Sequence, residues 1–225
     1  MFLHGSLSSD RTSSLTISRL DVADFILKQL TYRQYIFRQS SNFVLLKYFQ
    51  TIRSKNMMTI VENLRLPLIL LATVGSAVSG GIFFAFSTFV MHALAKLPSA
   101  QGIATMQSIN ITVINPWFMA AFFAPAMAGV LLSVSLLFQW QPTIAVYLLT
   151  ASLLYLVGTI GVTVAGNVPL NDALAVVTPT SIKGSTLWSQ YLTDWTFWNH
   201  VRTAAALLAA ILFAIALRHQ SGFIT

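Results

Sequence analysis

The sequence contains no cysteine and very few charged residues. The absence of cysteine excludes disulfide bonds, thiolate metal sites and a cysteine nucleophile. Charged residues make up 8% of the 225 residues and hydrophobic residues 56%, whereas a soluble domain carries about 25% charged residues. No Lys, Arg, Asp or Glu occurs between Lys96 and Asp172. A soluble fold would not stay dispersed with so long an uncharged stretch, so the composition indicates an integral membrane protein.

Positive charge is concentrated near the N-terminus. The net charge is +7, but residues 1–56 hold eight basic and three acidic side chains, whereas residues 57–225 hold five basic and three acidic ones. The body of the protein is therefore almost neutral, which argues against nucleic acid as a partner. The basic segment also favours a cytoplasmic N-terminus, because Lys and Arg gather on the cytoplasmic side of membrane spans.

Residues 1–56 form an N-terminal basic extension that differs from the rest of the chain. Its second half mixes aromatic and basic residues at roughly helical spacing, which is typical of a helix lying on an anionic membrane surface. An equally weighted interpretation is that translation starts at Met57 or Met58 and that the extension is upstream sequence. A transit peptide is a third interpretation.

Residues 57–225 contain four apolar runs near the length of about 20 residues that a helix needs to cross a bilayer. The predicted spans are 66–91, 116–138, 142–166 and 195–217. Asp194 is the predicted N-cap of the last span, because its carboxylate can accept hydrogen bonds from free backbone amides. The predicted fold is an all-α integral membrane four-helix bundle with up-down topology, multi-pass, with the lipid bilayer as its partner.

The connections between the predicted spans alternate in length. A short turn joins the second and third spans, whereas residues 92–115 and 167–193 are long. In up-down order both long loops lie on one membrane face, together with most of the polar residues. Within the first loop, Pro98 and Ser99 are expected to start a short helix. Small residues such as Gly80 and Gly158 predict close helix packing.

The motif "WNHVR" at the start of the last span is the strongest candidate site. Asn199 and Arg202 are three residues apart and share a helix face with Trp195, whereas His200 points about 100° away. One interpretation is that Arg202 and His200 extend toward lipid headgroups. The other is a functional site, because ionisable residues within membrane segments are functional candidates by default.

Two further polar motifs and one histidine complete the candidate set. "GNVPLNDAL" carries Asn167 and Asn171, which either form a structural turn or face the bundle as hydrogen-bonding groups. "MQSINITVINPWF" carries Asn110 and Asn115 ahead of the second span. His92 is either an interfacial histidine or a second titrating group. The ligands are too few and wrongly spaced for a metal, so none is predicted.

Four stretches together resemble the anthrone oxygenase-like family of small four-span membrane proteins. They are "GGIFFAFSTFVMHALAKLP", "GIATMQSINITVINPWFM", "NVPLNDALA" and "YLTDWTFWNHVRTAAALLA", and they cover roughly residues 75–217. The resemblance implies a four-helix membrane fold. It also implies an oxidoreductase, a monooxygenase that converts hydrophobic anthrone- or quinol-like substrates to quinones with O2 as co-substrate.

The implied chemistry assigns roles to the polar residues. A neutral His200 would remove the acidic proton of an anthrone, and Arg202 would stabilise the resulting anion. Asn167, Asn171 and Asn199 would orient the substrate. The carbanion would reduce O2 directly, so no metal or flavin cofactor is predicted. Two alternatives remain open: a non-catalytic membrane protein or complex partner, and a small-molecule carrier.

Overall fold

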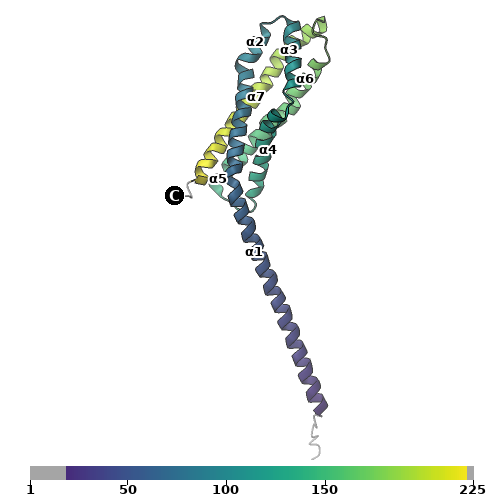
Figure 1. Ribbon diagram of the computed structural model, residues 1–225, viewed down its shortest axis with the longest axis vertical. Coiled ribbons are helices and arrows are strands. Elements are labelled where there is room, and N and C mark those ends of the chain that lie inside the picture. Colours follow the sequence, from purple (N-terminus) through teal and green to yellow (C-terminus); the bar gives the residue numbers. More distant parts are fainter. Residues whose placement is uncertain (1–18, 222–225) are drawn as a thin grey trace, which may run out of the picture. The chain divides into compact units, whose positions relative to one another are not determined.

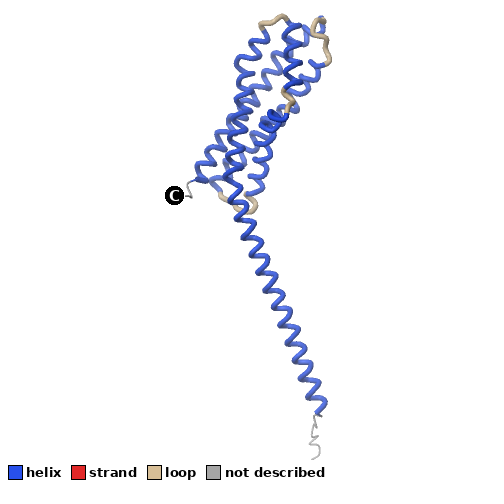
Figure 2. The backbone as a smooth tube through the Cα atoms, viewed as in Figure 1, coloured by secondary structure: helices blue, strands red, loops and turns tan. Residues whose placement is uncertain are grey.

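The computed structural model describes residues 19–221, and these residues form helices joined by short loops, with no strand (Figure 2). The labels η1 to η3 denote π-helical segments, in which the turns are wider than in an α-helix. The elements in order are α1 (Arg19–Ala85), η1 (Phe86–Val90), α2 (Met91–Ala95), α3 (Ser99–Thr112), α4 (Pro116–Ser135), α5 (Pro142–Leu153), η2 (Leu154–Gly161), η3 (Thr163–Asn167), α6 (Val168–Ala175) and α7 (Ile182–Ser221).

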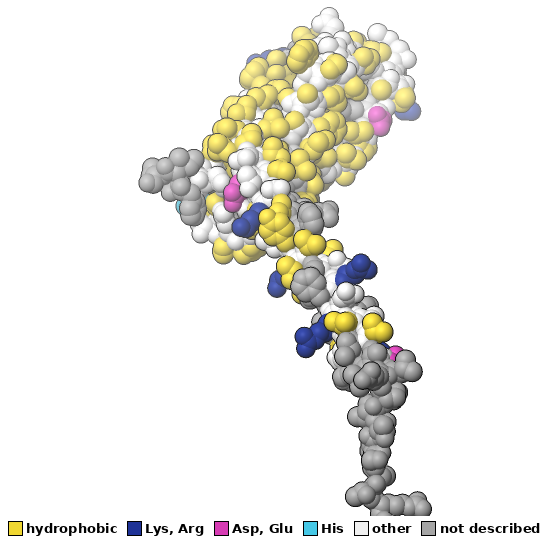
Figure 3. All heavy atoms as spheres, turned by 60° about the horizontal axis from the view of Figure 1, so that its bottom comes forward, with side chains coloured by type: hydrophobic (Ala, Val, Ile, Leu, Met, Phe, Trp, Pro, Cys, Tyr) yellow, Lys and Arg dark blue, Asp and Glu magenta, His cyan; other side chains and the backbone are white. Residues whose placement is uncertain are grey.

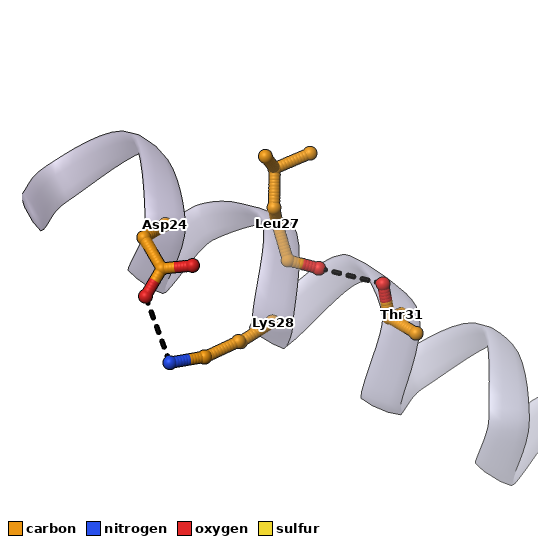
Figure 4. Close-up of polar contacts among 4 residues, drawn as sticks. All are labelled: Asp24, Leu27, Lys28 and Thr31. Atoms are coloured by element: carbon orange, nitrogen blue, oxygen red, sulfur yellow. Dashed lines mark hydrogen bonds and ion pairs between the residues drawn. The ribbon is translucent and has the colours of Figure 1, made fainter. Parts of the chain in front are cut away.

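The chain divides into two compact units, Met1–Asn56 and Met57–Thr225. The described part of the first unit is helical, with local contacts such as the 2.8 Å ion pair between Lys28 and Asp24 and the hydrogen bond from the Thr31 hydroxyl to the Leu27 carbonyl (Figure 4). Residues 1–18 of the extension lie outside the described residues. Its role as a surface helix, a transit peptide or upstream sequence stays a prediction.

Within residues 19–221, four helical stretches are long and apolar enough to cross a membrane: Asn42–Ala95, Pro116–Ser135, Pro142–Ala175 and Ile182–Gln220. The helices of the second unit lie alongside one another (Figure 1), and apolar side chains are spread over its visible surface (Figure 3). The predicted all-α membrane fold with four spans is therefore confirmed. The up-down order of the spans and the cytoplasmic N-terminus stay predictions.

The third and fourth helices are longer than predicted. The third continues past residue 166 through α6, and Pro169 lies just after the junction between the π-helical segment η3 and α6. The fourth begins at Ile182, and the Ser181 hydroxyl accepts a hydrogen bond from the Gly184 amide at this end. The prediction of Asp194 as N-cap is wrong, because Asp194 is an exposed residue inside α7.

Two buried clusters build the second unit. One joins the membrane-spanning parts of α1, α4, α5 and α7 through residues such as Ile69, Leu132, Leu148 and Phe213. The other joins α2, α3, α6 and α7. Here the Gln107 side-chain amide donates to the carbonyls of Leu174 and Val177 at 2.8 and 3.1 Å. The two long connections therefore contact each other, whereas their placement on one membrane face stays a prediction.

Close helix packing depends on Gly158. A Cβ atom built at Gly158 would lie 2.5 Å from the Cβ of Ala205 on α7, whereas one built at Gly81 would meet nothing within 4 Å. Gly158→Ala is expected to lower the free energy of unfolding by about 1–3 kcal/mol, because overpacking forces the backbones apart. Gly81→Ala is the matched control and should be neutral or stabilising. Thermal unfolding in detergent checks both, and equal stability of the two variants would contradict this packing.

Candidate functional site

A cavity of about 300 Å³ lies within the second unit, between the ends of several helices. Most of its lining is aromatic or aliphatic, with phenylalanines from α1, η1 and α4. The side chains in the lining that carry hydrogen-bonding groups come from α3, η3, α6 and α7, and they are Asn110, Thr163, Asn171, Trp195 and Arg202. A largely apolar pocket with a few convergent polar groups is the usual form of a small-molecule site.

Arg202 is the charged member of this lining, and only 7% of its surface is exposed. Its guanidinium carbon lies 4.2 Å from the centre of the Phe83 ring and 4.9 Å from that of Trp195. The Nε atom donates to Asn199 Oδ1 at 2.9 Å, and Nη1 lies 3.4 Å from Thr163 Oγ1. Ring stacking and hydrogen bonds therefore hold the guanidinium in one orientation.

Among the described residues, no acidic side chain pairs with Arg202. Burying a charge without a counter-ion costs on the order of several kcal/mol in a protein. The two aromatic rings offset part of that cost, because a desolvated cation over a ring gains about 2 kcal/mol. The remaining positive potential faces an apolar cavity, so the site is built to attract an anion or a developing negative charge.

Asn199 holds Arg202 in position from outside the cavity. It is fully buried and does not line the cavity. Its Nδ2 atom donates to the Phe83 carbonyl at 2.7 Å and to the Ser87 hydroxyl at 2.6 Å, which leaves Oδ1 to accept from Arg202. The Ser87 hydroxyl is also 3.1 Å from that of Thr203. This network explains why an asparagine precedes the arginine by three residues.

Asn171 is oriented in the same way. Its Oδ1 atom accepts hydrogen bonds from the Tyr191 hydroxyl and from the Trp195 indole N–H, both at 2.8 Å. Asn171 also lines the cavity. The site thus presents an amide held by two hydrogen bonds, that of Asn171, and a fixed cation, Arg202.

The other predicted asparagines have different positions. Asn110 lines the cavity from α3. Asn115 caps α4, because its Oδ1 accepts from the Phe118 amide at 3.0 Å. Asn167 is buried and donates to the Trp195 carbonyl at 3.1 Å. The segment "NVPLN" is helical, so the structural turn, one of the two interpretations of these asparagines, is not formed.

The two predicted histidines lie outside the cavity. His200 is exposed on the outer surface of α7, because the helix turns it away from the face that Asn199 and Arg202 share. His92 is also exposed, with Nδ1 2.8 Å from the Thr88 carbonyl. The structure therefore does not bring His200 and Arg202 together. Within residues 19–221, no three His, Cys, Asp or Glu side chains are grouped closely enough to hold a metal ion.

Sequence reasoning missed Tyr191 and Thr163, and it left open which phenylalanines of the run from Phe83 to Phe89 line a cavity and which face lipid. Phe83 and Phe86 line the cavity, whereas Phe84 and Phe89, which belong to the same aromatic run, are exposed. Tyr191 was not considered as a site residue because the last helix was expected to start at residue 195. The spacing of Trp188, Tyr191 and Trp195 was the signal, since these rings stack along one face of α7.

Comparison with known proteins gives a family match. Searches of curated proteins and of solved structures found no significant match. The model of the family described as anthrone oxygenase matches residues 117–212. This range contains Asn171, Trp195, Asn199 and Arg202, but not the cavity residues contributed by α1, η1 and α3. Residues 117–212 are thus similar to this family, which agrees with the resemblance of the sequence motifs over that range.

Proposed function

We propose that this protein is a membrane-embedded oxygenase that binds an anthrone- or quinol-like molecule in the cavity and oxidises it with O2, without a metal or flavin. The observation that carries the proposal is the buried Arg202, which lines an apolar cavity and has no acidic partner among the residues that the structure describes. A planar aromatic ketone matches such a site, because its rings suit the phenylalanine walls and its oxygen suits a fixed cation.

Substrate binding follows from the polar groups. We expect the substrate oxygen to lie against the Arg202 guanidinium and Asn171 Nδ2. Loss of a proton from the CH2 group of an anthrone places negative charge on that oxygen. Donors that are already fixed in place stabilise the new charge without having to reorganise, and such stabilisation is the largest single term in many enzymes.

The reaction balances with O2 as the oxidant. The substrate CH2 carbon loses a proton, and the enolate passes two electrons to O2 as a carbon–oxygen bond forms. The resulting peroxide anion regains the proton. Loss of the second C–H proton then breaks the O–O bond, so that one oxygen atom stays in the quinone and the other leaves as water. One anthrone and one O2 give one anthraquinone and one water.

The cavity lining contains no histidine or carboxylate to take the first proton. In this proposal the positive charge of Arg202 makes the bound substrate more acidic, and water accepts the proton. His200 is not used, because it faces away from the cavity. The chemistry therefore depends on anion stabilisation more than on a general base.

Oxygen uptake by the purified protein in lipid vesicles tests the proposal. With anthrone we expect consumption of one O2 per quinone formed, above the spontaneous rate in empty vesicles, and one labelled oxygen atom in the quinone when 18O2 is used. An anthrone with both CH2 hydrogens replaced by methyl groups should consume no O2. Binding of anthrones and quinols without oxygen uptake would contradict an oxygenase and favour a carrier.

A further inference from the structure

Four residues of the cavity lining reach the outer surface of the protein. They are Ile114, Phe123, Val164 and Val168, with exposed fractions of 71, 49, 63 and 38%. All four are apolar, whereas the hydrogen-bonding residues of the lining are buried or half-buried. We call these four residues the mouth.

The mouth takes Phe123 from α4, Val164 from η3 and Val168 from α6, and Ile114 from the loop that precedes α4. Phe123 belongs to one membrane-spanning stretch and Val164 and Val168 to another. Exposed side chains at these positions face hydrocarbon in a membrane, since they are apolar and belong to spans. An opening beside these three residues would connect the cavity with the interior of the bilayer, whereas Ile114 lies outside the spans.

At Met106 the cavity borders a packed cluster of side chains. Met106 of α3 lines the cavity and is 1% exposed, and it belongs to the cluster that contains Ile103, Leu174 and Trp188. The Gln107 side chain ties α3 to the end of α6 at this level. A molecule arriving from water on this side would therefore have to pass through a well-packed cluster.

We infer that the cavity is filled sideways from the bilayer, through the mouth, by a neutral apolar molecule that is dissolved in lipid. The chemical nature of this molecule rests on the proposed function, but its route does not. A substrate ionised in water would have to lose its hydration to pass four apolar side chains, at a cost that an unpaired anion cannot recover there. The substrate is thus neutral when it arrives, and its charge forms only beside Arg202.

Labelling of single cysteines tests this route, because the chain has no cysteine of its own. In Met106→Cys, the thiol is reachable only through the cavity. We expect a long-chain alkyl maleimide dissolved in the bilayer to label it about tenfold or more faster than a charged, water-soluble thiosulfonate, given the cost of bringing a charge past apolar side chains. Ile109→Cys, which also lines the cavity, provides a second thiol if Met106→Cys folds poorly.

Two thiols calibrate the reagents. Val157→Cys lies on an exposed part of η2 outside the lining and should react with the maleimide directly, whereas Leu132→Cys lies in the fully buried core and should stay unlabelled. Val164→Trp narrows the mouth and should slow maleimide labelling of Met106→Cys, whereas Val157→Trp should not. Faster labelling by the charged reagent, no labelling by either reagent, or no effect of Val164→Trp would overturn the lateral route.

The labelling result is independent of turnover. Faster labelling of the cavity thiol by the bilayer-dissolved maleimide, without oxygen uptake, would refute the proposed reaction and leave the route standing. Oxygen uptake by a protein whose cavity thiol reacts only with the charged reagent would refute the route and leave the reaction standing.

Discussion

Replacing Arg202 by lysine is expected to lower the rate of anthrone oxidation about a hundredfold to a thousandfold. Loss of one fixed donor to a developing oxyanion costs this much in enzymes of known mechanism. Lysine keeps the charge, but it lacks the planar group that stacks between Phe83 and Trp195 and that donates to Asn199 and Thr163. Steady-state oxygen uptake over a range of anthrone concentrations is the measurement.

Arg202→Met separates a functional role from a structural one. It removes a buried cation that has no acidic partner among the described residues. Replacing a buried charge by an apolar side chain of similar volume is often neutral or stabilising. We therefore expect loss of activity at a melting temperature close to or above that of the unchanged protein. A large fall in melting temperature with activity retained would identify Arg202 as a structural anchor.

His200→Ala is the matched control for both Arg202 variants. It lies two residues away on α7 and faces outward, so the proposed mechanism predicts a rate close to that of the unchanged protein. A loss of activity as large as that of Arg202→Lys would restore His200 as the base and would contradict the proton transfer to water.

Replacing Asn171 by aspartate is expected to lower turnover about a hundredfold or more, by placing a negative charge in the cavity that holds the substrate anion. The change is nearly isosteric. Aspartate keeps an oxygen that accepts from Tyr191 and Trp195, as Asn171 Oδ1 does. It exchanges the amide donor for a carboxylate oxygen, which would serve as a counter-ion for Arg202. The rate of oxygen uptake and the affinity for anthrone should both fall.

Asp172→Asn makes the reverse change at the next residue, which is exposed and does not line the cavity. It should leave oxygen uptake unaltered. If Asn171→Asp and Asp172→Asn have equal effects, the amide donor of Asn171 does not act on the substrate.

The membrane spans could be predicted because their signal is local. Apolar runs of sufficient length mark helices whatever their neighbours are, and the structure places a spanning helix on each of the four predicted runs. The short helix beginning at Ser99 was predicted from Pro98 and from the spacing of its apolar residues, and Ile103 and Met106 are indeed buried. The shared face of Asn199 and Arg202 followed from simple helical spacing.

The cavity could not be predicted because it depends on helix ends that no local signal fixes. Thr163 reaches Arg202 through the π-helical segments η2 and η3, and the angular spacing of an α-helix does not hold in their wider turns. Because α7 begins at Ile182, it also includes Tyr191, whose hydroxyl donates to Asn171. The convergence of polar residues on one face predicted too large a site, since Asn115, His92 and His200 lie at the same end but point elsewhere.

Trp195 gives this cavity a built-in optical signal. The chain has five tryptophans, and Trp195 is the one that belongs to the cavity lining. Its indole ring lies 4.9 Å from the Arg202 guanidinium carbon and donates to Asn171. Any ligand that draws the guanidinium toward itself changes the electric field across the ring, and thereby the colour and yield of its fluorescence. Ligand occupancy is thus readable from emission under nitrogen, before any oxygen is admitted.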